Sequence, residues 1–424
     1  MIRVLPPNPD IDHLKNQAKA LLKEHRDRDS AALKTLRKLH RFENASDEDI
    51  FAAQVALSDV QFALALEYGF KSWEDLRQEV QEMTARQGQA EAPRAGAFRL
   101  KDPLPGVAKG VNRFAYGYSM AMQYCGQACD YDTVMGDSGL AFILQADTEH
   151  RAWGKPVKQL DIGWWPLDPW GAMVRLEFVG RTCGRELSLL PSNDAEYEAD
   201  SATAYRKYFH PAVVASLRAG RPAVAAVPPN DIYLVTGCDD GQPPLLGQIS
   251  CSPEAKIERL KEYPWTVILL GERAEPMDRR QADREALRHA LDLARDRLDG
   301  RAPANKLSGQ AAFRLWASLL RDDEGWGAHF YHANVLGQLK ISRRSAVPYL
   351  REMAQRHPGS AQSHLLAAAQ AYADGLVELD TAKCDKETMG THDGRERLAQ
   401  LVERVAQIED KAAGEMEQAW AAMK

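Results

Sequence analysis

The spacing of apolar residues predicts a group of helices at the start of the chain. Between residues 11 and 25, Leu14, Ala18, Leu21 and Leu22 recur at the interval of one helical face. Four shorter helices are expected after this one: at 30–39, from about 46, from about 58 and from 72 to about 83. Serines 46, 58 and 72 are the expected N-caps, because a serine hydroxyl accepts hydrogen bonds from the first helical amides. This part is therefore predicted to be a small helical bundle.

A second run of helices is predicted at the other end of the chain. The three-four spacing of apolar residues indicates helices at 284–298, 309–320, 342–356, 361–377 and 395–423. No alternating pattern typical of strands separates them. A C-terminal helical bundle is expected.

The middle of the chain has a different pattern. One helix is expected at 116–124 and another at 205–219, closed by Gly220. Strands are expected at 173–179, which alternates apolar and polar residues, and at 223–227, 231–238, 245–250 and 266–270. This mixture predicts an α+β fold with a mainly antiparallel sheet. The expected organisation is a helical module at 1–83, a linker at 84–98, the α+β domain at 99–275 and the helical domain at 276–424.

Composition narrows the class of protein. The chain has 424 residues, 45% of them hydrophobic, and a net charge of −6. The mild acidity gives no long-range attraction to nucleic acid or to anionic membranes, so neither partner is expected. There is no apolar run long enough to span a bilayer and no signal-like start, and six cysteines do not make a disulfide framework. We expect a cytoplasmic protein.

Several familiar chemistries have no motif here. The sequence contains neither of the glycine-rich phosphate loops nor the G-x-S-x-G nucleophile elbow, and we expect no cofactor. His329 and His332 form an H-x2-H pair, and Cys125 and Cys129 form a C-x3-C pair. Both pairs lack matched further ligands, so no metal site is expected.

Two segments carry a resemblance to known proteins. The first, from Leu5-Pro6-Pro7-Asn8-Pro9 to a closing Tyr-Gly-Phe-x-Ser-Trp at 68–73, resembles a helical module found ahead of ankyrin repeats in bacterial proteins. That resemblance implies an appended module and no reaction. Within it, Phe70 and Trp73 are interpreted as core residues.

The second segment lies at about 107–272. Its most specific string is Met135-Gly136-x-Ser138-Gly139-x-Ala141-Phe142, and the later helix, Gly-x-Pro strand and Gly-x-Asp turn follow in order. It resembles the N-terminal domain of the butirosin-biosynthesis acyltransferase family, a papain-like, cysteine-peptidase-like domain related to bacteriocin-leader peptidases. The resemblance implies a central helix with a cysteine at its start and a strand that supplies a histidine.

This sequence lacks both groups. The segment expected to hold the nucleophile, 110–116, contains no cysteine, and the strand expected to supply the base, 230–235, contains no histidine. A conventional Cys-His mechanism is therefore excluded at those positions. Three residues are weak candidates for a relocated nucleophile: Ser119, Cys125 and Cys238. Packing is the alternative interpretation of all three.

Polar and aromatic residues near the implied cleft are candidate ligand-binding groups: Asn112, Arg113, Tyr116, Tyr118, Asp137, Glu149, Trp165, Asp231, Tyr233 and Asp239. The tyrosines could equally fill the core, and Asp239 could cap its own turn. Trp165 belongs to a segment with three tryptophans and two prolines, which is either a pocket lid or a hydrophobic plug.

Three functions follow from these observations. The first is a catalytically degenerate papain-like protein that binds a small polar molecule or a peptide in the former active-site cleft. The second is an acyltransferase or amidase with a relocated nucleophile. The third is a scaffold for protein interactions. The identity of the ligand and the oligomeric state have no signal in the sequence.

Overall fold

The structure is a computed structural model of the whole chain. The residues that it describes are 11–42, 45–80, 98–100, 110–147, 151–152, 155–156, 159–161, 174–191, 199–228, 231–250, 256–297, 306–322 and 328–423. The chain divides into two compact units, residues 1–96 and 97–424. Glu149 and Trp165, two of the predicted ligand-binding residues, lie outside the described residues.

The first unit is a bundle of short helices, as predicted. Its helices are α1 (Ile11–Arg26), α2 (Ala31–Leu36), α3 (Asp47–Ala52), α4 (Leu57–Glu67) and a last one at 73–80, with a 3-10 turn at His40–Phe42. The predicted stripe of α1 is buried against α2 and α4. Phe70 and Trp73 pack against this core, partly buried, which confirms their interpretation as core residues.

Two of the three serines predicted as N-caps in this unit, Ser46 and Ser72, do cap their helices. Ser46 Oγ accepts a hydrogen bond from Asp49 N at 3.2 Å, and Ser72 Oγ accepts one from Asp75 N at 3.0 Å. The predicted cap at Ser58 is wrong, because α4 begins at Leu57. Asp59 Oδ2 there accepts a hydrogen bond from Ala56 N at 2.9 Å, so the acidic residue takes the capping role from the serine.

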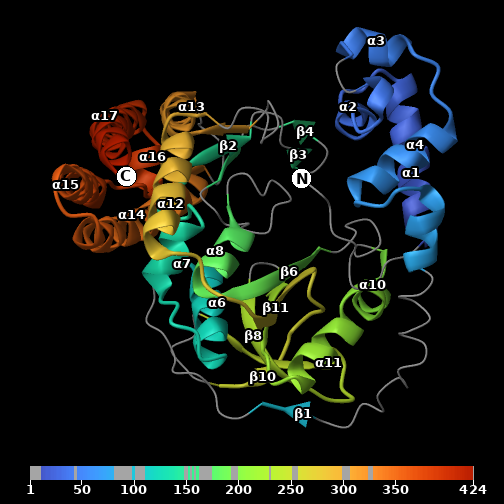
Figure 1. Cartoon of the computed structure of the whole chain (residues 1–424). Helices are drawn as coiled ribbons and strands as arrows, with labels where there is room; N and C mark the ends of the chain where they lie inside the picture. The colour runs from blue at the N-terminus through green and yellow to red at the C-terminus, as the bar shows by residue number, and fades with distance from the viewer. Residues whose placement is uncertain are drawn as a thin grey trace. The chain divides into compact units, whose positions relative to one another are not determined.

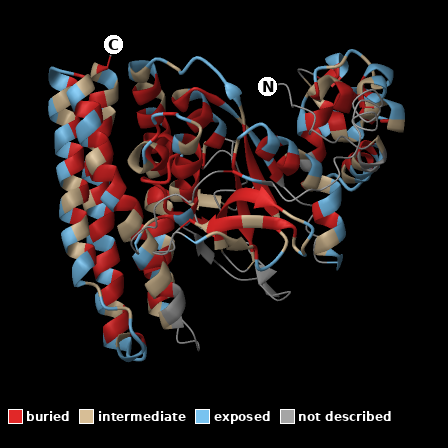
Figure 2. Cartoon of the chain, turned by 90° about the horizontal axis from the view of Figure 1, so that it is seen from below, coloured by how far each residue is buried: buried red, intermediate tan, exposed pale blue. Residues whose placement is uncertain are grey.

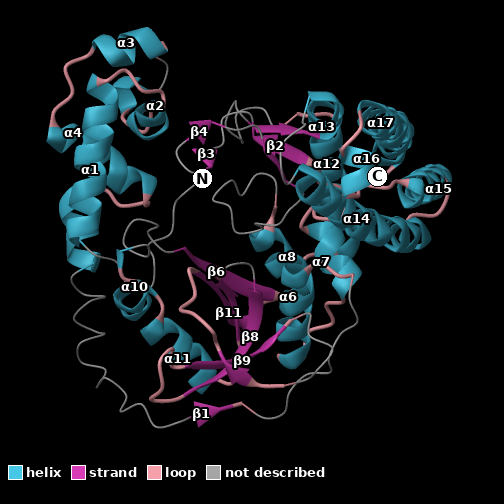
Figure 3. Ribbon diagram, turned by 180° about the vertical axis from the view of Figure 1, so that it is seen from behind, coloured by secondary structure: helices cyan, strands magenta, loops and turns pink. Residues whose placement is uncertain are grey.

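The second unit contains an antiparallel sheet, so the α+β class is confirmed (Figures 1 and 3). Its strand order is β10-β9-β8-β7-β11-β6, with β1 paired to β8. The strands are β1 (Phe98–Arg99), β6 (Arg185–Pro191), β7 (Ala223–Val227), β8 (Asp231–Cys238), β9 (Leu245–Ile249), β10 (Glu258–Arg259) and β11 (Thr266–Arg273). The four strands predicted between 223 and 270 are present. Short strands outside this sheet are β2 (Gln145–Asp147), β3 (Arg151–Ala152), β4 (Lys155–Pro156), β5 (Gln159–Asp161) and β12 (Lys306–Ser308).

The central strands are buried on both faces of the sheet. Alternate residues of β8 belong to different cores: Ile232 and Leu234 pack in the core that contains α6 (Arg113–Tyr124), and Tyr233 and Val235 pack in the core that contains α11 (His210–Arg218). Figure 3 shows α6 on one side of the sheet and α10 (Ser201–Tyr208) with α11 on the other. This is why β8 is a continuous apolar run.

Two secondary-structure predictions in this region are wrong. The strand predicted at 173–179 overlaps the helix α8 (Leu176–Cys183). Leu176, Val179 and Cys183 are buried at helical spacing, and Gly184 closes the helix at a φ of +71°. The single helix predicted at 205–219 is two helices, α10 and α11, because Pro211 in the first turn of α11 cannot donate the amide that would continue α10.

The five predicted C-terminal helices are present in the predicted order, and a sixth, short helix was not predicted. They are α12 (Arg279–Ala294), α13 (Gly309–Asp322), α14 (Ala328–Arg356), α15 (Ser360–Thr381), the short α16 (Lys386–Met389) and α17 (His392–Ala422). Figure 2 shows the buried stripe along each long helix facing the inside of this bundle. Among the described residues, no helix has both the length and the hydropathy that crossing a membrane requires.

One hydrophobic core joins the sheet region to these helices. It contains Met122 of α6, Met135 of α7 (Tyr131–Asp137), Ile268 of β11, Leu350 of α14 and Met416 of α17. The predicted domain boundary near residue 275 therefore lies inside one compact unit.

Candidate functional site

The N-terminal end of α6 gathers several of the predicted ligand-binding residues. Asn112 caps the helix: its Oδ1 accepts a hydrogen bond from Ala115 N at 3.0 Å, and its own backbone N donates to Tyr131 Oη at 2.9 Å. The Ser250 hydroxyl, at the end of β9, donates to the Arg113 carbonyl at 2.6 Å. These contacts fix the first turn of α6 against the sheet and against α7.

Arg113 and Asp231 meet at this end of the helix. Arg113 Nη1 lies 3.1 Å from Asp231 Oδ1, and Lys261 Nζ lies 3.2 Å from Asp231 Oδ2. The side chain of Arg113 is 45% exposed and that of Asp231 is 19% exposed, so solvent reaches the pair. Tyr116, one turn further along α6, is half-buried beside Tyr131 with ring centroids 6.4 Å apart. The two segments that lack the cysteine and the histidine are thus in contact, through an ion pair.

Three other candidates lie away from this end of α6. Tyr118 is fully buried, with a hydroxyl that has no hydrogen-bond partner among the described residues, and burial raises its pKa. Tyr233 faces the α11 side of the sheet, where burial raises its pKa to about 12. Asp239 follows β8 at the opposite end from Asp231, about 25 Å along the strand. The structure does not bring these three together with Arg113.

Asp239 forms a turn cap. Its Oδ1 accepts a hydrogen bond from Gly241 N at 2.8 Å, which confirms that it caps its own turn. Its two carboxylate oxygens also accept hydrogen bonds from Arg259 at 2.6 Å each. The hydrogen bonds from Arg259 hold the pKa of Asp239 below its usual value.

Asp137 is the hub of a buried network. Its carboxylate accepts hydrogen bonds from both terminal nitrogens of Arg279 at 2.8 and 2.7 Å, from Tyr349 Oη at 2.6 Å and from Thr182 Oγ1 at 2.7 Å. Arg279 also contacts Asp283, which is fully buried and binds Arg356 and His357. These contacts connect α7 and α8 to α12 and α14. Asp137 has all its hydrogen-bonding positions occupied by protein groups.

The rest of the Met135–Phe142 string also packs against α12 and α14. We call residues 135–143 the docking segment. A Cβ at Gly136 would overlap the ring of Tyr349, and one at Gly139 would lie 2.8 Å from the ring of His289. Arg343 Nη1 donates to the carbonyls of Ala141 and Ile143, at 3.1 Å each. The glycines are required so that α12 and α14 can approach closely.

Sequence reasoning missed the partners of the docking segment. Tyr349 and Arg343 come from a helix predicted only as part of an amphipathic bundle, and Arg279 lies before the predicted start of its helix at residue 284. Arg343 is buried together with Glu409 of α17, its Nε and Nη2 donating to the two Glu409 oxygens at 2.7 and 2.8 Å. The one available signal was a charged residue on an otherwise apolar helical stripe.

The surroundings of the three candidate nucleophiles do not favour their activation for attack on a substrate. Ser119 Oγ donates to the Cys129 carbonyl at 3.0 Å and accepts from Gln123, so within the described residues neither hydrogen bond involves a histidine. Burial raises the pKa of Cys125, at the C-terminal end of α6. Cys238 is buried at the end of β8 beside β1 and β9. None of the three adjoins the Arg113–Asp231 pair along α6 or β8.

We expect the thiols of Cys125 and Cys129 to react slowly in the folded protein. A hydrogen bond with Cys183, together with burial, raises the pKa of Cys129, and a raised pKa keeps a thiol neutral and unreactive at pH 6 to 8. Alkylation by iodoacetamide, followed by peptide mass spectrometry, is expected to be at least about tenfold slower in native than in guanidinium-unfolded protein at both positions. Rapid labelling of either native thiol would contradict this expectation.

The described residues form no cluster of three or more histidine, cysteine, aspartate or glutamate side chains that could hold a metal ion. His332 of the H-x2-H pair is fully buried, and its Nδ1 accepts a hydrogen bond from Trp316 Nε1 at 3.1 Å. Comparison of the chain with protein-family models and with curated proteins gave no match.

Proposed function

We propose that this chain is a papain-like protein without Cys-His chemistry, which binds a small polar molecule or a peptide at the N-terminal end of α6. The observation that carries the proposal is the Arg113–Asp231 ion pair. It joins the start of the central helix to the start of β8, the two places where the resembling family supplies a nucleophile and a base.

The groups at this end of α6 are suited to binding. Arg113 and Lys261 offer cationic donors, Asp231 offers acceptors, and the half-buried Tyr116 adds an aromatic surface. The guanidinium fork recognises carboxylates, and the N-terminus of a helix favours negative charge. A ligand with a carboxylate can compete with Asp231 for Arg113, which makes an amino acid derivative or a peptide terminus a suitable class.

The same groups do not support nucleophilic catalysis. A guanidinium stays protonated in proteins and has no lone pair available for attack. The relocated-nucleophile alternative is disfavoured by the hydrogen bonds of Ser119 and by the raised pKa of Cys125. Binding is therefore the function that these contacts favour.

The test is recovery of a ligand from cell extract. We expect native wild-type protein, passed through extract and then through gel filtration, to retain a polar compound detectable by mass spectrometry. Arg113→Gln is expected to lower the retained amount about tenfold, since it removes a charge-assisted contact. Arg218→Gln, an exposed arginine on α11, is the matched control and is expected to retain the compound. Equal retention by Arg113→Gln and wild type, or turnover of the compound, would refute the proposal.

A further inference from the structure

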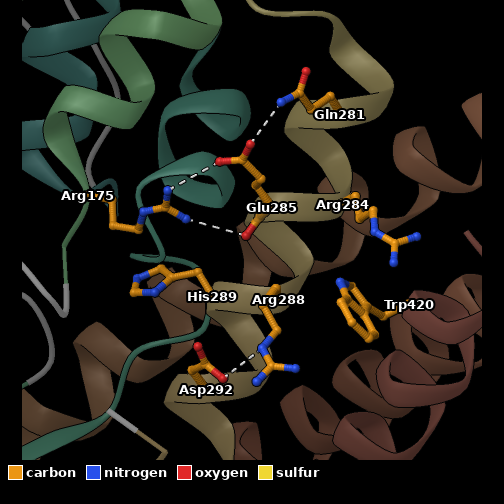
Figure 4. A pocket seen from close by; sticks show the side chains of 8 residues that line it. All are labelled: Arg175, Gln281, Arg284, Glu285, Arg288, His289, Asp292 and Trp420. Carbon is orange, nitrogen blue, oxygen red and sulfur yellow. Dashed lines mark hydrogen bonds and ion pairs between the residues drawn. The ribbon is translucent and has the colours of Figure 1, made fainter. Parts of the chain in front are cut away.

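A pocket of about 400 Å³ opens on α12, where this helix meets the end of α17 and the start of α8 (Figure 4). Its volume is in the range of small-molecule sites. Its walls carry three guanidiniums, from Arg175, Arg284 and Arg288, against two carboxylates, from Glu285 and Asp292. The pocket therefore has an excess of positive charge.

The two carboxylates have guanidinium partners. Arg175 Nη2 lies 3.6 Å from Glu285 Oε2, and Arg288 Nε lies 3.1 Å from Asp292 Oδ1. Gln281 Nε2 donates to Glu285 at 3.2 Å, and Figure 4 shows the Glu285 carboxylate turned toward Gln281 and Arg175, away from Arg284. The Glu285 carboxylate, next to Arg284 in α12, is thus turned away from Arg284 and bound to other groups.

Arg284 is the third guanidinium of the pocket and, unlike Arg175 and Arg288, it is not paired with a carboxylate of the described residues. It is half-buried, donates to the Met423 carbonyl and lies over the Trp420 ring, with its central carbon 4.6 Å from the ring centroid. Within the described part of the chain no carboxylate contacts it. A half-buried guanidinium that no carboxylate of the described residues contacts is a suitable partner for a carboxylate or a phosphate of a ligand.

The wall beside Arg284 is aromatic. Arg288 lies 5.3 Å from the centroid of the same indole, so Trp420 stands beside both cations. His289 also lines the pocket, on the side of α12 that faces Arg175 (Figure 4). A planar group can pack against the Trp420 indole while an oxyanion reaches Arg284.

From this geometry we infer that the α12 pocket binds a small molecule with an oxyanion, a carboxylate or a phosphate, attached to a planar ring. Arg284 holds the oxyanion and Trp420 packs against the ring. The inference uses none of the residues at the N-terminal end of α6, so it stands or falls independently of the proposed function.

The test is isothermal titration calorimetry of the full chain with benzoate, phenyl phosphate and inorganic phosphate. We expect at least one aromatic probe to saturate with a Kd of about 1 mM or below, more tightly than inorganic phosphate. The tighter of the two aromatic probes identifies the oxyanion. Arg284→Met is expected to weaken that probe about tenfold to hundredfold, since it removes a charge-assisted pair of hydrogen bonds but keeps the aliphatic stem.

Two controls make the result specific. Arg280→Met changes an exposed arginine on the same helix and is expected to bind the aromatic probe like wild type. Arg284→Lys, which keeps the charge, replaces Arg284→Met if that variant melts at a lower temperature, and is expected to lose affinity through the missing fork. Failure of both aromatic probes to saturate, or equal affinity of the Arg284 and Arg280 variants, overturns the inference.

Discussion

Gly136→Ala is expected to destabilise the second unit by about 3 kcal/mol, a large effect for the addition of one methyl group. The added Cβ would overlap the ring of Tyr349, which is fully buried and donates its hydroxyl to Asp137. Neither the Tyr349 side chain nor helix α14 can move aside without breaking the hydrogen bonds of the Asp137 network. Urea unfolding followed by circular dichroism measures the loss.

Gly337→Ala is the matched control. Gly337 also lies in a helix, α14, and a Cβ there meets no atom within 4 Å. Alanine at an open helical position is expected to stabilise by about 0.5 to 1 kcal/mol. The same substitution should therefore change the free energy of unfolding in opposite directions at the two positions. A loss of less than about 1 kcal/mol for Gly136→Ala would show that α14 does not pack closely on α7.

Arg343→Met is the second substitution with a large expected effect, about 3 to 5 kcal/mol of destabilisation. The side chains of Arg343 and Glu409 are only 2% and 9% exposed. Removal of the guanidinium leaves a buried carboxylate without its partner and takes a donor from the Ala141 and Ile143 carbonyls. The free energy of unfolding in urea is again the measurement.

The adjacent residue supplies the control. Arg344 is 56% exposed and lies 3.8 Å from Asp380, so Arg344→Met is expected to cost at most about 1 kcal/mol. The double variant Arg343→Met with Glu409→Leu is expected to recover much of the loss, because no buried charge then remains. Similar stabilities for the Arg343 and Arg344 variants would mean that the buried pair does not hold α14 to α17.

Much of the fold was predictable because its elements carry long or unambiguous patterns. The long helices α15 and α17 repeat their apolar stripe over many turns, and β7, β8 and β11 are apolar runs bounded by turn residues. The short segment around α8 was not predictable. Over the seven residues 173–179 the apolar positions fit an alternating pattern as well as a helical one. The residue that indicates a helix is Gly184, which closes α8 and lies outside that stretch.

The candidate site was predictable only in part, because its contacts join distant residues. Arg113 and Asp231 were both singled out as candidate ligand-binding residues. They are 118 positions apart in the sequence, and no sequence pattern predicts that they form an ion pair. The Met135–Phe142 string was singled out as the most specific part of the resemblance to a papain-like domain. Its glycines, however, are explained by helices far along the chain: Asp137 and Tyr349 are 212 positions apart.

The docking segment has a consequence for synthesis of the protein on the ribosome. Residues 135–143 leave the ribosome long before the helices that cover them, and Glu409, which completes the Arg343 pair, is made 268 residues after Ala141. At about 5 to 20 residues per second this interval is roughly 15 to 50 seconds. During that time Met135, Ala141 and Phe142 lack the helices that bury them in the folded chain, so the growing chain exposes apolar surface at this segment.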